Sequence, residues 1–152
     1  MDVLNLPAYQ YKIRQNDGKQ EIFDPIRRKY IALTPEEWVR QHFIHYLHIV
    51  KAVPLTLITV EQELVYNSMK RRSDIVVYSN KGVPALMVEC KAASVEITQK
   101  VFDQVARYNL TMKVPFLVVT NGLRHICCKI DFEKSSYSFL EEIPDYRQMV
   151  IT

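Results

Sequence analysis

Three charged residues stand at the ends of two hydrophobic runs in the middle of the chain. Asp74 begins the first run, Glu89 and Lys91 end the second, and the turn-forming segment 79–84 separates the two. Apolar runs around such a segment predict two antiparallel strands, and the start of one strand then lies beside the end of the other. We therefore expect the three charged side chains to meet at one end of a sheet.

Two carboxylates beside a lysine suit the hydrolysis of a phosphodiester. Asp74 and Glu89 supply the hard oxygen ligands that Mg²⁺ prefers, Mn²⁺ can substitute, and the backbone carbonyl of Cys90 is a candidate third ligand. The cation would polarise a phosphate and lower the pKa of a bound water. Lys91 would orient that water or offset charge on the phosphate. The alternative for the same residues is an ion-pair cluster that only stabilises the sheet end.

The elements that position these residues predict an α/β fold. A helix over 34–50 follows several short N-terminal strands, and a second helix over 95–110 joins the strand 85–91 to the apolar strand 115–120. A strand–helix–strand unit implies a parallel pair with a right-handed crossover. Since the preceding hairpin is antiparallel, we expect a three-layer domain with a central mixed sheet flanked by helices.

Length and composition predict one ordinary globular domain. The chain has 152 residues, 48% of them hydrophobic, and we expect a single domain over 1–152 with its core at about 20–130 and an acidic, loose tail over 141–152. No apolar run predicts a membrane span or a secretory signal. Three cysteines without disulfide or metal spacing predict reduced thiols in a cytoplasmic protein. The net charge of +3 permits DNA binding without requiring it.

Further acids and bases are candidates for the same site. Thr34 and Glu37 form a Thr-x-x-Glu capping box, which accounts for Glu37, so the adjacent Glu36 is the candidate additional metal ligand. Glu61 and Glu63 alternate on an extended segment, and a solvated strand face is the alternative to a site role for them. A basic run offers candidate DNA phosphate contacts, although such runs are often only solvated: it consists of Lys70, Arg71 and Arg72.

The pattern Asp74 … Glu89-x-Lys91 on a hairpin followed by a helix resembles the PD-(D/E)XK nuclease superfamily. More narrowly, the chain resembles the N-terminal nuclease domain of type I restriction enzyme R subunits in three stretches, 33–41, 72–77 and 88–92. Gln104 and Tyr108 match the Gln-x-x-x-Tyr motif of that group, and the motifs follow one another in the right order over about 20–125. Ser73 departs from the proline in the superfamily name.

The resemblance implies a metal-dependent DNA endonuclease of restriction type that works with a partner or as a dimer. It assigns Gln104 to the catalytic group and Tyr108 to DNA contact. The expected partners are DNA and either a second copy or other restriction-system chains, with no membrane. Because the sequence ends at Thr152, we expect no helicase motor and no use of ATP. Two alternatives stay open: a catalytically weak nuclease-fold module for DNA binding or assembly, and a DNA repair nuclease of the same fold.

Overall fold

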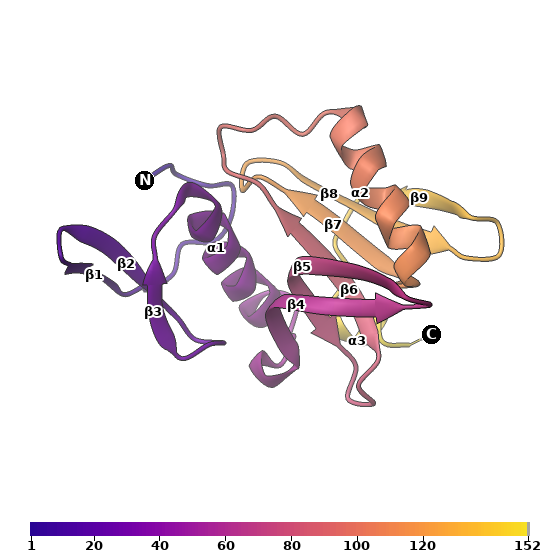
Figure 1. Ribbon diagram of the computed structural model, residues 1–152, viewed down its shortest axis with the longest axis horizontal. Helices are drawn as coiled ribbons and strands as arrows, with labels where there is room; N and C mark the ends of the chain where they lie inside the picture. The colour runs from indigo at the N-terminus through magenta and orange to yellow at the C-terminus, as the bar shows by residue number, and fades with distance from the viewer. Residues whose placement is uncertain (152) are drawn as a thin grey trace.

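The computed structural model describes residues 1–151 and has two separate β-sheets (Figure 1). The first sheet comprises β1 (Ile13–Asn16), β2 (Lys19–Asp24) and β3 (Lys29–Ala32). The second comprises β4 (Ile58–Tyr66), β5 (Met69–Tyr78), β6 (Pro84–Cys90), β7 (Phe116–Thr120), β8 (His125–Asp131) and β9 (Ser136–Leu140). The helices are α1 (Pro35–Ile49), the short 3₁₀ helix η1 (Leu55–Leu57), α2 (Gln99–Met112) and α3 (Tyr146–Met149).

The six strands of the large sheet lie in chain order from β4 to β9. All neighbouring pairs are antiparallel except β6 and β7, which are parallel and are joined by α2. The predicted strand–helix–strand unit is therefore confirmed, and so is the mixed sheet. The five residues of β7 are buried without exception, as expected for a wholly apolar central strand.

Two hydrophobic cores lie on opposite faces of this sheet. Ile75 and Val77 pack with Phe43 of α1, whereas Val76 between them packs with Phe102 of α2. Successive side chains of a strand point to opposite faces, so α1 and α2 cover different sides. Figure 1 shows α1 and α2 on either side of the sheet, which confirms the three-layer α/β prediction.

The small sheet lies beyond α1, away from the large sheet (Figure 1). Its first two strands form a hairpin around Asp17 and Gly18, whose φ angles of 50° and 76° are those of a tight turn between twisted strands. Burial along β2 rises toward Asp24, which is fully buried at the end of the strand. The small sheet therefore contacts the rest of the molecule at the Asp24 end of β2 and not at the hairpin tip.

Two boundaries differ from the sequence predictions. The second helix begins at Gln99 rather than at 95, because the hydroxyl of Thr98 accepts a hydrogen bond from the N–H of Val101 and caps the helix. The C-terminal segment is not a loose tail: it contains α3, and Ile143 and Met149 are buried in the core under α1. The acidic residues of this segment favoured the prediction of a loose tail, although the segment also contains the apolar residues that anchor it.

In residues 1–151 no helix has the length and apolar character that a membrane crossing requires.

The β4–β5 ladder is interrupted at Glu61 and Asp74, which lie opposite each other and are both left out of the pairing. Glu61 has a φ of 53°, a left-handed conformation that is uncommon for a residue with a side chain. Val60 packs toward α1, whereas Leu64, four residues later, packs toward α2. Residues four apart in a regular strand share one face, so the alternation of faces reverses at this point, although the pairing register is the same on both sides of it.

Candidate functional site

The end of the β5–β6 hairpin brings Asp74 and Glu89 together. Regular pairing of the two strands ends at Ile75 and Val88, immediately before the two acids. Oδ2 of Asp74 accepts a hydrogen bond from the N–H of Cys90 at 2.7 Å, so the Asp74 side chain bonds a backbone donor just past the last paired residues. Asp74 is thereby fixed across the end of β6, at the interruption that it shares with Glu61.

Glu89 is the most perturbed acid of this group. Burial raises the pKa of Glu89 to about 7, the neighbouring Asp74 carboxylate adds to the rise, and the positive charges of Arg71 and Lys91 oppose it. Two carboxylates held close together away from bulk water favour the neutral form of one of them. Lys91, which is half-buried, lies directly after the end of β6 and supplies one of the two nearby positive charges.

Arg71 reaches Glu89 from β5, and this differs from a simple phosphate-contact role. Its Nη2 donates to Oε1 of Glu89 at 2.9 Å, and its guanidinium lies 4.5 Å from the ring centroid of Tyr108 on α2. Tyr108 is 46% exposed, and Gln104, one turn earlier on the helix, is also exposed. The structure thus connects Tyr108 with the Asp74–Glu89 pair through Arg71, while Gln104 stays at the surface.

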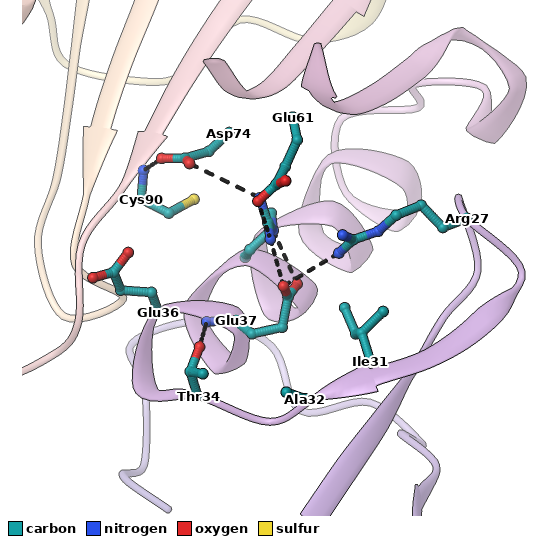
Figure 2. A pocket seen from close by; sticks show the side chains of 10 residues that line it. Arg27, Ile31, Ala32, Thr34, Glu36, Glu37, Glu61, Asp74 and Cys90 are labelled. Atoms are coloured by element: carbon teal, nitrogen blue, oxygen red, sulfur yellow. Dashed lines mark hydrogen bonds and ion pairs between the residues drawn. The ribbon is translucent and has the colours of Figure 1, made fainter. Parts of the chain in front are cut away.

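A cavity of about 340 Å³ lies on the α1 side of Asp74 (Figure 2). Its walls come from the start of α1, from β3 and from the interrupted strands, and they include Glu36, Glu61 and the thiol-bearing Cys90. Glu36 is exposed and lines this cavity, so it faces the same hollow as Asp74. Glu89 and Lys91 do not line this cavity. Asp74 therefore lines the cavity and also interacts with Glu89, which lies outside it.

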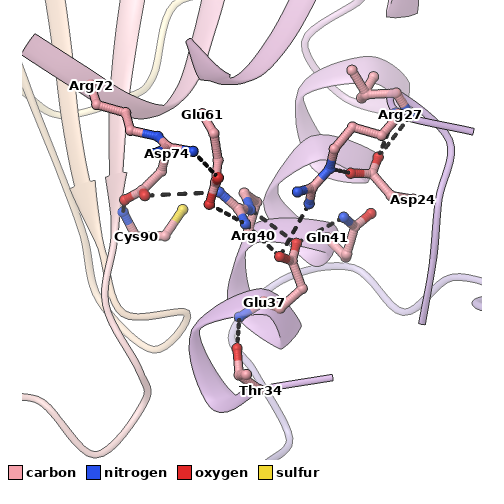
Figure 3. Close-up of polar contacts among 11 residues, drawn as sticks. Asp24, Arg27, Thr34, Glu37, Arg40, Gln41, Glu61, Arg72, Asp74 and Cys90 are labelled. Atoms are coloured by element: carbon pink, nitrogen blue, oxygen red, sulfur yellow. Dashed lines mark hydrogen bonds and ion pairs between the residues drawn. The ribbon is translucent and has the colours of Figure 1, made fainter. Parts of the chain in front are cut away.

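Arg40 of α1 is the buried cation of this cavity (Figure 3). Its Nε donates to Glu37 at 2.9 Å, its Nη2 donates to Glu37 and to Glu61, the latter at 3.2 Å, and its Nη1 lies 3.9 Å from Oδ1 of Asp74. Desolvation alone would lower the pKa of Arg40, but the hydrogen bonds and charge of Glu37 outweigh it and raise that pKa. Arg40 is therefore a permanent positive charge beside Asp74.

Glu37 does not complete the predicted capping box. The hydroxyl of Thr34 accepts a hydrogen bond from the N–H of Glu37 at 3.1 Å, as expected for an N-cap. The Glu37 carboxylate, however, is buried and receives hydrogen bonds from Arg40, Gln41 and Arg27. Burial alone would raise the pKa of Glu37, and these hydrogen bonds from Arg40 and Gln41 lower it. The carboxylate is thus ionised and fully occupied by protein donors.

An unbroken series of ion pairs runs from the large sheet to the small one (Figure 3). Each member is paired with the next, in the order Arg72, Glu61, Arg40, Glu37, Arg27 and Asp24. Arg40 is not among the residues that the sequence predicts for the site, whereas Glu61 is a predicted candidate with a solvated strand face as the alternative. The one local signal was the spacing of three between Glu37 and Arg40, which favours an ion pair on a helix.

Further cationic side chains are exposed on β5 and on α2. Arg72 is the most exposed member of the ion-pair series, with 68% of its side chain accessible, and Lys70 is exposed on the same strand. A hollow on the outer face of α2 is lined by Gln104 and Asp103 together with Lys100 and Arg107, two bases that are not among the predicted site residues. Their spacing of four and three residues from Gln104 was the available signal.

The donor set at Asp74 and Glu89 fits a hard divalent cation. Mg²⁺ is typically held by one or two carboxylates and keeps several waters, and a cation between the two acids would relieve the repulsion that contributes to the raised pKa of Glu89. No group of three or more His, Cys, Asp or Glu side chains placed to hold a metal occurs within residues 1–151. The fit thus depends on two carboxylates completed by backbone and water oxygens.

Comparison with protein families gives a match over more than half of the chain. The family described as Type I restriction enzyme R protein N terminus (HSDR_N) matches residues 35–144. The matched region begins with α1, ends between β9 and α3, and so includes Arg40, Asp74, Glu89 and Lys91. A search of curated proteins finds no match.

Proposed function

This chain belongs to the family of type I restriction enzyme R protein N-terminal domains, and from that premise we propose that it is a metal-dependent DNA endonuclease module. The observation that supports the proposal best is the placing of two carboxylates side by side at a sheet end, where the pKa of Glu89 is raised to about 7. Active sites concentrate such perturbed groups because catalysis uses them.

In the proposed reaction, Asp74 and Glu89 hold Mg²⁺, with Mn²⁺ as a substitute and the Cys90 carbonyl as a further ligand. A bound cation would supply positive charge to the scissile phosphate and lower the pKa of the attacking water. Lys91 would orient that water and offset negative charge that develops on the phosphate oxygens. Glu36, which lines the cavity beside Asp74, is the candidate additional ligand.

DNA would lie across β5 and the outer face of α2. Lys70 and Arg72 on the strand, with Tyr108 and Gln104 on the helix, present exposed polar and cationic groups. Tyr108 lies against Arg71, which bonds Glu89. Contacts of lysine and arginine with phosphates supply most sequence-independent affinity for DNA. A second copy of the chain or other restriction-system chains would complete the assembly.

A second candidate function is a nuclease-fold module that binds DNA or assembles with partners without useful cleavage. It is favoured by the internal pairing of the site, in which Arg71 contacts Glu89 and Arg40 lies beside Asp74. Carboxylates that are already paired with arginines need no cation to be stable. The two candidates differ in whether the protein cleaves DNA when a divalent cation is supplied.

Incubation of the full chain with supercoiled plasmid, in Mg²⁺ or in chelator, tests the proposal. We expect nicking or linearisation only in Mg²⁺, and a loss of about 100-fold or more in Lys91→Ala. Lys81→Ala is the matched control, because Lys81 is an exposed lysine in the turn of the same hairpin. Cleavage that persists in Lys91→Ala would point to a contaminant, and DNA binding without cleavage by wild type would favour the second candidate.

A further inference from the structure

Arg71 holds Glu89 through a single hydrogen bond. Its Nη2 donates to Glu89 Oε1 at 2.9 Å, whereas its Nε is buried and has no hydrogen-bond partner in the described part of the chain. Arg40, in contrast, uses both Nε and Nη2 on the carboxylate of Glu37. Since arginine–carboxylate pairs are strongest when two parallel hydrogen bonds form, the Arg71–Glu89 pair is the weaker of the two.

Tyr108 supports Arg71 without fixing its direction. The guanidinium carbon of Arg71 lies 4.5 Å from the ring centroid of Tyr108, and about half of that tyrosine is exposed. Attraction between a cation and an aromatic face imposes no hydrogen-bond direction, so a guanidinium can turn above the ring and keep much of the interaction. Arg71 can therefore leave Glu89 toward solvent while it remains against Tyr108.

A divalent cation and Arg71 are alternatives at Glu89. The cation would be bound by the carboxylate whose Oε1 now accepts from Arg71, and a charge of +2 a few ångströms from a guanidinium repels it. Lys91, the other positive charge that acts on Glu89, does not offset that repulsion, because it would repel the divalent cation as well. Binding of the cation therefore favours departure of the arginine.

We propose that Arg71 is a displaceable counter-ion of the site. It holds Glu89 in the cation-free protein, it is released when a divalent cation binds Asp74 and Glu89, and the released guanidinium then contacts a DNA phosphate beside Tyr108. The proposal rests on the proposed function, since it takes Asp74 and Glu89 as ligands of the cation. It couples metal binding to DNA binding through one side chain.

Calorimetric titration of the full chain with Mn²⁺ tests the first step without any need for cleavage. Arg71→Gln removes the competitor, so it should bind Mn²⁺ about fivefold more tightly than wild type, the equivalent of one modest ion pair. Arg14→Gln is the matched control and should leave the affinity unchanged. Arg14 also joins a glutamate, Glu21, at 2.8 Å and lies 4.1 Å from the ring centroid of Tyr30, but in the small sheet.

The salt dependence of DNA binding, followed by fluorescence anisotropy with a duplex, tests the second step. In Ca²⁺, Arg71→Gln should lower the slope of log affinity against log salt by about 0.9, the loss of one phosphate contact. In chelator the slope should equal that of wild type, because Arg71 is then held by Glu89. Melting curves of both variants establish that each is folded before it is compared.

The outcomes separate this proposal from the proposed function. Arg71→Gln that binds Mn²⁺ no more tightly than wild type overturns the displacement step, and an equal loss of slope in Ca²⁺ and in chelator overturns the release step. If wild type and the double variant Asp74→Asn/Glu89→Gln bind Mn²⁺ equally, the cation site lies elsewhere and the proposed function itself fails.

Discussion

Replacement of Glu89 by glutamine should change how stability depends on pH. The pKa of Glu89 is about 7 in the folded protein against its usual 4.5, and only 12% of its side chain is exposed. Between these two pH values the folded state keeps a proton that the unfolded chain has already lost. The stability linked to this proton is therefore complete below pH 4.5 and is lost as pH rises through 7.

The size of the effect follows from the shift. A rise from 4.5 to about 7 corresponds to about 3 kcal/mol, and roughly two-thirds or more of it is lost between pH 5 and pH 8. Glu89→Gln has no such proton to lose. Its free energy of unfolding relative to wild type should thus increase by about 2 to 3 kcal/mol from pH 5 to pH 8, and Mg²⁺ at pH 8 should reduce the difference by stabilising wild type alone.

Urea denaturation at several pH values measures this difference. The difference between two proteins is needed because burial lowers the pKa of His42 and His125, and these histidines stabilise the fold as pH rises, which opposes the effect of Glu89. Glu63→Gln, an exposed acid on β4, is the matched control and should follow wild type at every pH. A constant difference between Glu89→Gln and wild type from pH 5 to pH 8 would refute the reasoning.

Three further substitutions test the framework around the site by urea denaturation. Arg40→Met should cost about 3 to 5 kcal/mol because it leaves Glu37 buried without its main partner, whereas Arg14→Gln at the surface should cost less than about 1 kcal/mol; equal losses would contradict this. Thr34→Ala should cost about 1 kcal/mol through the lost N-cap hydrogen bond, and no loss would mean that the cap adds nothing. Ser68→Gly should stabilise by up to about 1 kcal/mol, because Ser68 has a φ of 68° in the β4–β5 turn; a loss of stability would show that its side chain matters more than its backbone.

Local signals were enough to predict the fold. The unbroken apolar runs of β6 and β7, the hairpin between β5 and β6, and the cap at Thr34 each depend on residues close in sequence, and each is present in the structure. The layers then follow from the crossover rule alone. The C-terminal segment was the exception, since Met149 is anchored by the distant α1 core rather than by any neighbour.

The surroundings of the site depend on partners that are distant in sequence. Glu37 has a complete local explanation in its capping box, yet Arg27, ten residues earlier, and Arg40 occupy its carboxylate once the small sheet packs on α1. Glu61 lies in an alternating segment that predicts a regular strand. Nothing in that pattern indicates that the ladder is interrupted at Glu61 or that the alternation of faces reverses there. Tertiary packing decided both positions.

The interruption at Glu61 and Asp74 divides the β4–β5 hairpin into an inner and an outer part. Its inner part is fixed between the two cores, while the outer part, over 62–73, is largely exposed and carries Arg71. The two parts meet where Glu61 and Asp74 are left out of the ladder pairing. Arg71 and Arg72 of the outer part donate hydrogen bonds to Glu89 and Glu61, so side chains rather than the ladder connect the outer part to the acids at the interruption.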